Sequence, residues 1–359
     1  MRARPGYDDL PVALVNLLEP LELVRAFQSH PPEGFTPLDL AAPAFATRFD
    51  LSTTLEPALR RSLSWVPAPK PMTAFVGTTV SEYALFPAEV APEELVRSLV
   101  GRLGAQYSFV IIKDIPGEPL LVGGEAFAYT QALTAACHAA GFELMDGQAL
   151  AYVPIDFGST DAFLNRLSHA RRKNLRRKLR EGAAIEVEAI QTGDPRFGND
   201  AFIAEVYRLY CQVYAQSEIH FDLLSKGFFR AVLRSAEMNA TMFRYRTAGT
   251  MIGWNLCFER DGMLIDKYIG FDYPAARAHH LYTFSWFRNL QHALDRGLRM
   301  YVAGWTDPEI KRQLGARLTP TLHAVRARNP LLRAALRRAK RWFEPDRRWT
   351  SANDAPDRS

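Results

Sequence analysis

The sequence predicts an α+β fold, because strand-forming runs that would pair in hairpins are followed by alternating helices and strands. Two turn signals, Thr247–Thr250 and Asp261–Gly262, separate three runs rich in β-branched and aromatic residues. Helical spacing of apolar residues then alternates with short apolar runs, an order typical of α+β domains. The expected elements are strands over Thr241–Arg246, Met251–Glu259 and Met263–Phe271, a helix over His280–Asp295, a strand over Leu298–Ala303, a helix over Pro308–Leu314 and a strand over Leu318–Val325.

The first part of the chain contains a similar mixture of elements. Residues 1–71 hold 11 of the 23 prolines, so we expect an irregular segment with short helices near Glu19–Gln28 and Thr54–Ser64. Regular patterns begin at Thr73. They predict strands over Thr73–Val76, Tyr83–Phe86, Tyr107–Lys113, Phe142–Leu144 and Ala149–Ile155, and helices over Pro92–Leu103 and Ala126–Ala140.

Size and composition limit the class of protein. A chain of 359 residues can form two domains with hydrophobic cores, and a hydrophobic content of 48% is ordinary for a globular protein. No apolar run reaches the roughly 18–20 residues that span a bilayer. The N-terminus is interrupted by Asp8, Pro11 and Asn16, unlike a signal peptide. An odd number of widely spaced cysteines argues against disulfides or a metal site and favours a reducing cytoplasm; they are Cys137, Cys211 and Cys257.

A strongly basic helix is predicted in the middle of the chain. Seven of the ten residues Arg171–Arg180 are Arg or Lys and none is acidic. On a helical wheel, Arg171 falls inside an apolar stripe, where a charge needs a partner. One interpretation is an internal ion pair with a solvated outer face. The other is that Arg171, Arg172 and Arg176 grip the phosphates of a donor such as CoA, a carrier-protein arm or tRNA. The stripe consists of Leu164, Leu167, Leu175 and Leu179.

Two segments resemble a known family. Phe163–Ser168, running into Arg171–Arg177, is similar to the opening of the C-terminal GNAT-like domain in Fem-type and BioF2-like acyltransferases. Glu309–Gly315 is similar to the segment after the penultimate strand in the same proteins. The resemblance covers roughly Asp161–Ala327 and implies two tandem GNAT-like domains, each a mixed, mostly antiparallel sheet flanked by helices. We therefore expect an irregular segment over 1–71, a first domain over 72–158, a second, catalytic domain over 159–328, and a basic helix with a disordered tail over 329–359.

One departure from ordinary GNAT enzymes concerns the donor. Asp272–His280 lacks the glycine-rich pyrophosphate loop of acetyl-CoA-dependent members, and only Arg277 fits the first position of that loop. This departure argues against a simple acetyl-CoA donor.

The strand Met263–Phe271 carries the first candidates for catalysis. Acyl transfer to an amine requires a deprotonated nitrogen, donors for the carbonyl oxygen and a proton for the leaving group. We predict Asp266 as base and Tyr268 as proton donor on one face of the strand. His280, beside His279, is the second choice of proton carrier. Resemblance implies that main-chain N–H groups around Tyr268–Gly270 hold the carbonyl.

Other interpretations of these residues remain open at this point. Asp266 and Tyr268 would also fit hydrogen bonds that merely stabilise the sheet. If the Fem-like match holds, Lys311 lies near a cleft mouth and contacts a phosphate or carboxylate; the alternative is a contact with helix carbonyls.

The C-terminal helix has apolar residues on one side and basic residues on the other over residues 331–343. Such a helix suits an anionic membrane surface, and docking on the protein itself is an equal alternative. The apolar side consists of Leu331, Leu332, Ala335, Leu336, Ala339, Trp342 and Phe343, and the basic side of Arg333, Arg337, Lys340 and Arg341.

Together these features predict a cytoplasmic N-acyltransferase with no permanently bound cofactor and no metal. The donor would be acyl-CoA or an acyl-carrier protein, and the acceptor an amine of a cell-envelope or lipid-like precursor. The first alternative is a Fem-like transferase that uses aminoacyl-tRNA. The second is a non-catalytic protein that binds RNA or a membrane surface, although no RNA-binding motif supports the RNA version.

Overall fold

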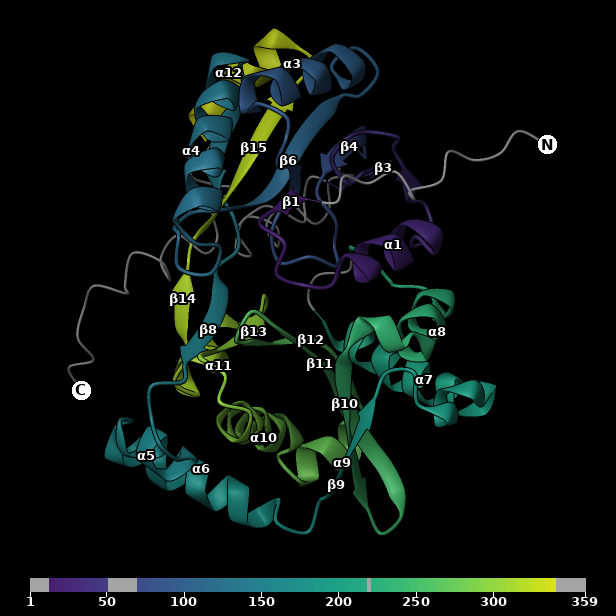
Figure 1. The fold of residues 1–359 in the computed structure, drawn as a ribbon, viewed down its shortest axis with the longest axis vertical. Helices are drawn as coiled ribbons and strands as arrows, with labels where there is room; N and C mark the ends of the chain where they lie inside the picture. The colour runs from purple at the N-terminus through teal and green to yellow at the C-terminus, as the bar shows by residue number, and fades with distance from the viewer. Residues whose placement is uncertain (1–12, 51–69, 218–220, 340–359) are drawn as a thin grey trace. The chain divides into compact units, whose positions relative to one another are not determined.

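The computed structural model describes residues 13–50, 70–217 and 221–339. They form two compact units, and each is described by itself. The first unit contains the chain up to Ala149 and again from Thr319, whereas the second is the continuous stretch Leu150–Leu318 (Figure 1). The expected helix at Thr54–Ser64 and the part of the C-terminal helix beyond Ala339 lie outside the described residues.

A six-stranded sheet in the order β2-β3-β4-β6-β15-β7 forms the first unit. Only β4 and β6 are parallel neighbours; the other pairs are antiparallel. A separate antiparallel pair consists of β1 and β5. The elements of this unit are β1 Leu14–Val15, α1 Leu21–Ser29, β2 Thr36–Pro37, β3 Ala44–Arg48, β4 Met72–Val76, β5 Phe86–Pro87, α3 Pro92–Leu103, β6 Phe109–Pro116, α4 Gly124–Ala139, β7 Glu143–Asp146, β15 Thr321–Ala327 and α12 Pro330–Ala339.

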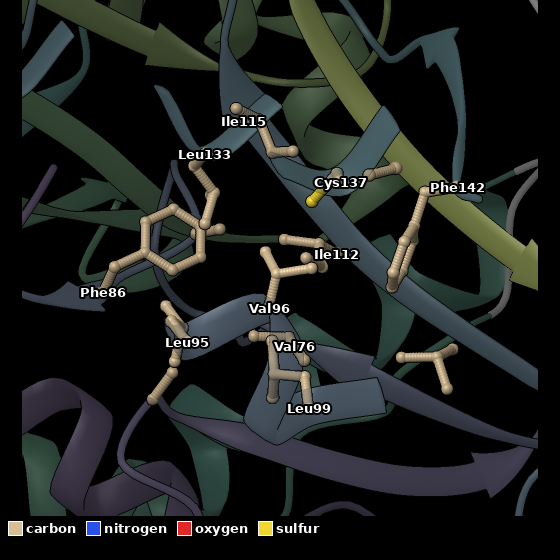
Figure 2. Packing of buried hydrophobic residues seen from close by; sticks show 14 of the residues in the cluster. Val76, Phe86, Leu95, Val96, Leu99, Ile112, Ile115, Leu133, Cys137 and Phe142 are labelled. Carbon is tan, nitrogen blue, oxygen red and sulfur yellow. The ribbon is translucent and has the colours of Figure 1, made fainter. Parts of the chain in front are cut away.

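Helices α3 and α4 supply the core on one face of this sheet. Helix α3 begins with Pro92 at its first position and two acids in its first turn, both favourable at a helix N-terminus. Its buried residues recur three and four apart and pack with apolar residues of β4, β6 and α4 (Figure 2). The labelled members are Val76, Phe86, Leu95, Val96, Leu99, Ile112, Ile115, Leu133, Cys137 and Phe142.

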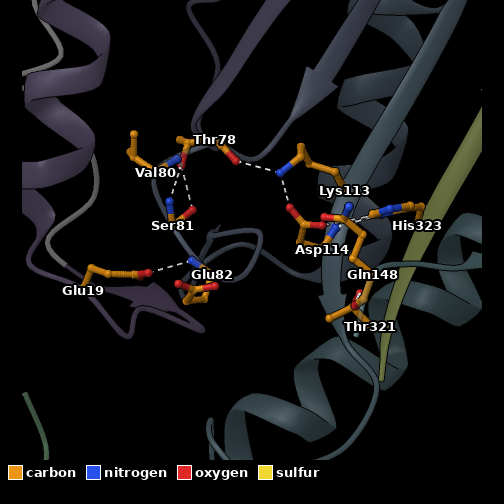
Figure 3. Close-up of polar contacts among 10 residues, drawn as sticks. All are labelled: Glu19, Thr78, Val80, Ser81, Glu82, Lys113, Asp114, Gln148, Thr321 and His323. Atoms are coloured by element: carbon orange, nitrogen blue, oxygen red, sulfur yellow. Dashed lines mark hydrogen bonds and ion pairs between the residues drawn. The ribbon is translucent and has the colours of Figure 1, made fainter. Parts of the chain in front are cut away.

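A polar cluster interrupts the apolar packing where β4 and β6 stop pairing, just after Val76 and Ile112 (Figure 3). The register of β6 against β15 shifts there, and Asp114 takes a left-handed φ of 55°, a conformation that Asp tolerates better than most residues. The Asp114 N–H donates to Nδ1 of His323 at 3.0 Å, and Lys113 Nζ donates to the Thr78 carbonyl at 2.9 Å. These bonds fix the loop that leaves β4.

The second unit has a seven-stranded sheet in the order β14-β8-β13-β12-β11-β10-β9. Its only parallel pair among the described pairings is β12 with β13. The elements are β8 Leu150–Pro154, α5 Thr160–Asn165, α6 His169–Glu181, β9 Glu186–Gln191, α7 Asp200–Gln216, α8 Lys226–Arg234, β10 Ala240–Thr247, β11 Thr250–Arg260, β12 Met263–Phe271, α9 Tyr273–Ala278, α10 Leu281–Asp295, β13 Met300–Gly304, α11 Pro308–Gln313 and β14 Arg317–Thr319.

Helices cover both faces of the central strands of this sheet. Helix α10 lies on one face, where Asn289 bonds to Asn255 of β11 (Figure 1). Helix α7 lies on the other, where Trp254 Nε1 donates to the Val206 carbonyl at 3.0 Å. The close approach of α7 requires glycine at position 270, because a Cβ there would lie 2.9 Å from the Tyr210 nitrogen.

The α+β class with mixed, mostly antiparallel sheets is confirmed, but two strands pair differently from the expected domain boundaries. Strand β8 was assigned to the first domain and pairs with β13 in the second unit. Strand β15 was assigned to the second domain and pairs with β6 and β7 in the first. An apolar pattern identifies a strand without identifying the sheet it joins, so the sequence placed both strands by order alone.

We predict that acidification destabilises the protein partly through His323. Burial lowers the pKa of His323 from its usual 6.5, against the attraction of Asp114. The unfolded chain therefore takes up this proton first, and stability falls as the pH drops below 6.5 toward the folded pKa. The free energy of unfolding, from urea titrations at pH 8 and pH 5.5, should fall less in His323→Gln than in the natural protein.

The matched control is His138→Gln, which replaces an exposed histidine on α4. This control should keep the natural pH dependence. Equal pH dependence in all three proteins would contradict the role of His323.

Candidate active site

The parallel strands β12 and β13 separate before they end. Their ladder covers three pairs, from Met263 with Met300 to Ile265 with Val302. Strand β12 nevertheless runs on to Phe271 and β13 to Gly304, and no ladder pair joins the two strands beyond Ile265 in the described part of the chain. From Asp266 onward, the main chain of β12 therefore has no paired strand on the β13 side within the described residues. We call this opening the β12–β13 fork. Crevices at the carboxyl ends of parallel strands are the usual ligand sites of such sheets.

A β-bulge lies at the fork and changes the faces of β12. Asp266 pairs with Cys257 and Tyr268 pairs with Leu256, so Lys267 is the extra residue. Because Cys257 and Leu256 are adjacent, their partners point to opposite faces. The expectation that Asp266 and Tyr268 share one face is therefore wrong. The extra residue reverses the alternation of side chains between the two faces of the sheet, and the sequence pattern of β12 does not reveal the bulge.

Asp266 lies on the α10 face, inside a buried hydrogen-bond network. Its Oδ1 accepts from Asn255 Nδ2 at 3.1 Å, and its Oδ2 accepts from Asn289 Nδ2 at 2.8 Å and from the Tyr301 hydroxyl at 2.9 Å. The Tyr245 hydroxyl donates to Asn255 Oδ1 at 2.6 Å. Burial raises the pKa of Asp266 above its usual value, and the hydrogen bonds from Asn255 and Tyr301 offset part of this rise. Such a carboxylate fits a positioning role better than that of a base; its catalytic role stays a prediction.

Tyr268 lies on the opposite face, against α8. Its ring meets those of Phe228 and Phe229 edge-on, with centroids 5.7 and 5.6 Å apart. The residue is 6% exposed. The structure therefore separates the two predicted strand residues by the thickness of the sheet, and the role of Tyr268 as proton donor also stays a prediction.

Lys311 is buried and fixes the turn that follows β13. Its ammonium donates to the carbonyl of Gly304 at 3.0 Å and to that of Trp305. Its charge also acts to lower the pKa of Asp266. The turn is strained, because Thr306 and Asp307 have left-handed φ values of 64° and 48° and a β-branched residue rarely adopts them. Lys311 was expected to contact a phosphate or carboxylate, or else carbonyls of its own helix. It contacts carbonyls, but these belong to Gly304 and Trp305, which precede its helix.

The segment after β12 forms a helical turn where a glycine-rich loop would lie in other GNAT enzymes. Arg277 of α9 donates to Gln216 Oε1 at 3.0 Å and lies over the Tyr273 ring, 5.2 Å from its centroid. His280 precedes α10 in a left-handed conformation, and its Nε2 lies 2.8 Å from Glu181 Oε2. Since Glu181 ends α6, the basic helix meets the start of α10 here.

The basic segment consists of two helices rather than one. Helix α5 stops at Asn165 and α6 starts at His169, because Ser168 is extended. Arg176 contacts Asp161 at 3.2 Å, Arg172 reaches the Asn165 carbonyl at 3.5 Å, and Arg171 is half-buried with an interaction partner of its own. The exposed pair of Arg176 with Asp161 therefore adds little stability.

The polar partners of Asp266 were not predicted from the sequence. Asn255 and Asn289 are fully buried, and Tyr301 is 1% exposed. A signal was present, because Asn255 interrupts a strand-forming run and Asn289 falls on the buried face of a helix. A polar residue in a core position needs a hydrogen-bond partner, and two such residues could have been paired with Asp266.

Across the described ranges, no cluster of His, Cys, Asp and Glu side chains is suited to hold a metal ion. Within the same residues, every helix is too short or too polar to cross a bilayer.

We predict that Asp266→Ala destabilises the protein by about 3 kcal/mol or more, because it leaves buried donors of Asn255, Asn289 and Tyr301 without their acceptor. Urea unfolding followed by circular dichroism would measure this change. Asp161→Ala, which removes an exposed carboxylate paired with Arg176, is the control and should cost less than about 1 kcal/mol. If both variants were equally stable, Asp266 would not support the fold as described.

Solved structures with a similar fold include the L-PGS of Bacillus licheniformis, at 10% identity over 92% of this chain and 98% of that chain, with a TM-score of 0.55. The C-terminal domain of a protein assigned as a lysylphosphatidylglycerol synthetase from Agrobacterium fabrum is 14% identical, with 89% of each chain covered and a TM-score of 0.54. FemX is 10% identical over 85% of this chain and 95% of that chain, with a TM-score of 0.48. No curated protein sequence matches the chain.

The expected α+β fold, with two mixed, mostly antiparallel sheets flanked by helices, is confirmed. A family model described as peptidoglycan biosynthesis and recognition matches residues 124–352, which include the whole β12–β13 fork and the basic helix. The chain belongs to the FemAB-like family.

Proposed function

We propose that this member of a family of acyl and aminoacyl transferases moves an acyl group from a phosphate-bearing thioester, acyl-CoA or an acyl-carrier protein, to an amine. The observation that carries this proposal is the β12–β13 fork, where β12 lacks a ladder partner beyond Ile265. Main-chain N–H groups around Tyr268–Gly270 can then hold the carbonyl oxygen of the acyl group. Such donors stabilise the charge that develops on that oxygen during attack.

The proton carriers in this proposal differ in their access to a substrate. Asp266 is half-buried and its two carboxylate oxygens are occupied by hydrogen bonds, and Tyr268 packs under α8. His280 keeps 29% of its side chain exposed and lies at the start of α10. We therefore propose His280 as the first proton carrier, oriented by Glu181, with Asp266 and Lys311 as positioning residues for the fork.

The basic helix α6 supports a donor with several phosphates. Arg171, Arg172 and Arg176, together with Arg277 of α9, would contact these phosphates. The same charges support the alternative donor, aminoacyl-tRNA, and so does the helical turn α9 in place of a glycine-rich loop. The acceptor would be an amine of a cell-envelope or lipid-like precursor, in keeping with the family description and with the lysylphosphatidylglycerol synthetase of similar fold.

We predict that the identity of the donor appears in thermal-shift experiments with CoA, acyl-CoAs and bulk aminoacyl-tRNA. A ligand that binds only the folded state raises the melting temperature. Stabilisation by CoA species supports the thioester donor; stabilisation by tRNA with steep salt dependence supports the alternative. Mass spectrometry should then detect the amide formed from the stabilising donor and n-butylamine.

The double variant Arg172→Ala/Arg176→Ala should weaken binding of the donor. If the donor is tRNA, the slope of the logarithm of the binding constant against the logarithm of the salt concentration should fall by about two. The matched control is Arg230→Ala, which removes an exposed arginine of α8 paired with Asp200. No stabilisation by any donor would instead favour a non-catalytic binding protein.

We also propose that α12 contacts an anionic membrane from the cytoplasmic side. Leu331 is 81% exposed and Leu332 is 39% exposed, although both are large apolar residues. Arg337 and Arg338 are exposed on the same helix, and Arg337 pairs with Glu143 at 2.7 Å. Exposed leucines beside arginines suit the boundary between headgroups and acyl chains.

Leu331→Asp/Leu332→Asp should lower cosedimentation with phosphatidylglycerol vesicles by about tenfold. Two leucines that insert partly into the membrane contribute a few kcal/mol of binding free energy at most. Vesicles of phosphatidylcholine alone should bind weakly in every case. The control Leu223→Asp changes an exposed leucine of the second unit, 40% exposed, and should bind like the natural protein. Equal binding by both variants would contradict this membrane contact.

A further inference from the structure

Positive charge gathers at the carboxyl end of α4, in the first unit. The helix is followed by Ala140 and by Gly141, which has a left-handed φ of 80°. Arg326 of β15 donates from Nε to the Ala140 carbonyl at 3.2 Å. Its Nη1 would lie 2.9 Å from a Cβ at position 104, so it also reaches Gly104 at the end of α3. Because the last carbonyls of a helix carry partial negative charge, the place of this first arginine is explained.

A second arginine, Arg333 of α12, reaches the same place from the other side. Helix α12 lies against β15 and β7, beside the end of α4 (Figure 1). The Nη1 atom of Arg333 would lie 3.1 Å from a Cβ at position 141, so the glycine there leaves room for the guanidinium. Ala140 and Gly141 are consecutive, and their Cα atoms are therefore only about 3.8 Å apart. The two guanidinium groups thus meet at one peptide group.

No acid neutralises these two arginines within the described residues. The carboxylate of Glu143 on β7 is close by, but it pairs with Arg337 at 2.7 Å. The buried Nε of Arg333 has no hydrogen-bond partner in the described part of the chain. Burial lowers the pKa of Arg326 from its usual value, and the charge of Arg333 lowers it further. Two half-buried cations side by side repel each other, and a bound anion would remove this repulsion.

The shape of the two side chains favours phosphate among the common anions. A guanidinium group is planar and offers its N–H donors in a fork that matches oxyanions. Arg326 uses its Nε for the Ala140 carbonyl, which leaves its terminal nitrogens for a ligand, and Arg333 keeps its Nε as well. A carboxylate has two oxygens and is satisfied by one such fork. A phosphate group has enough oxygens to accept from both arginines at once.

We propose that Arg326 and Arg333 form a phosphate-binding site at the end of α4. The phosphate could belong to a lipid headgroup or be free in solution, and both sources have the same chemistry. The lipid is favoured by the two residues before Arg333, because Leu331 is 81% exposed and Leu332 is 39% exposed. The lipid source rests on the membrane contact proposed for α12, whereas the site itself does not.

The first experiment measures free phosphate, by equilibrium dialysis of the full-length chain against radiolabelled inorganic phosphate. We expect a single phosphate per chain. Arg333→Gln should weaken its binding by about tenfold or more, the usual effect of losing a hydrogen bond between charged groups. Arg333→Lys keeps the charge without the planar fork and should recover part of the affinity. The matched control Arg338→Gln removes an exposed arginine of the same helix and should bind phosphate normally.

The second experiment measures lipid binding, by cosedimentation with phosphatidylcholine vesicles that contain a second, anionic lipid. This lipid is either phosphatidic acid, whose headgroup is a bare phosphate, or oleic acid at a matched surface charge. The natural protein and Arg338→Gln should prefer phosphatidic acid, and Arg333→Gln should lose this preference. An unchanged melting temperature would show that Arg333→Gln is folded. Arg326→Gln gives a second variant, which should lose the same preference.

The site is overturned if Arg333→Gln binds inorganic phosphate like the natural protein, or if Arg338→Gln loses as much affinity. Phosphate binding that depends on Arg333, without a preference for phosphatidic acid, would support the site and overturn the lipid source.

The phosphate site and the membrane contact fail separately. If Leu331→Asp/Leu332→Asp keeps full binding to vesicles while Arg333→Gln loses phosphate, only the membrane contact of the leucines is wrong. If the leucine variant loses vesicle binding while Arg333→Gln binds phosphate and phosphatidic acid normally, only the phosphate site is wrong.

Discussion

The second unit is organised around the hydrogen bonds to one half-buried carboxylate, that of Asp266. A charged carboxylate that loses part of its hydration incurs a cost that donors and a positive charge must offset. Its donors come from β11, α10 and β13, and the ammonium of Lys311 belongs to α11. Each of these elements therefore has a fixed place relative to β12. The network lies directly beyond the last ladder pair, so hydrogen bonds between side chains take over where pairing of the main chain stops.

The fork then follows from a small number of local features. The extra residue Lys267 turns Asp266 toward α10 and Tyr268 toward α8. On the neighbouring strand, the register against β8 shifts between Val302 and Gly304, and the strained turn begins. Lys311 closes that turn by binding its carbonyls. His280, at the start of α10, keeps 29% of its side chain exposed beside these buried groups.

Much of the fold could be predicted from the sequence, because hairpin signals and helical spacing are local. The strand Met263–Phe271 was predicted with the bounds found, and the helix predicted over His280–Asp295 begins one residue later, at Leu281. The bulge at Lys267 could not be predicted, because one extra residue moves the following side chains of β12 to the opposite face without changing the composition of the strand. The strands with which β8 and β15 pair could not be predicted either, because the apolar pattern of one strand does not specify its partner. For the candidate site, the sequence indicated β12 but not the partners of Asp266, because Asn255, Asn289 and Tyr301 meet it only through tertiary packing.

The path of the chain has a consequence for how the two units are connected. The second unit is one continuous insertion within the first, and it leaves and re-enters at neighbouring points: the Gly147 N–H donates to the Thr321 carbonyl at 2.7 Å. Both links thus start from a single paired stretch, which continues on the other side as neighbouring strands β8 and β14. Splitting the gene at the middle would divide the first unit into two fragments, neither of which carries all its strands. Excising the insertion at this junction would leave that sheet complete. The boundary between the units therefore consists of two chain positions, one on each side of the insertion, and not of one.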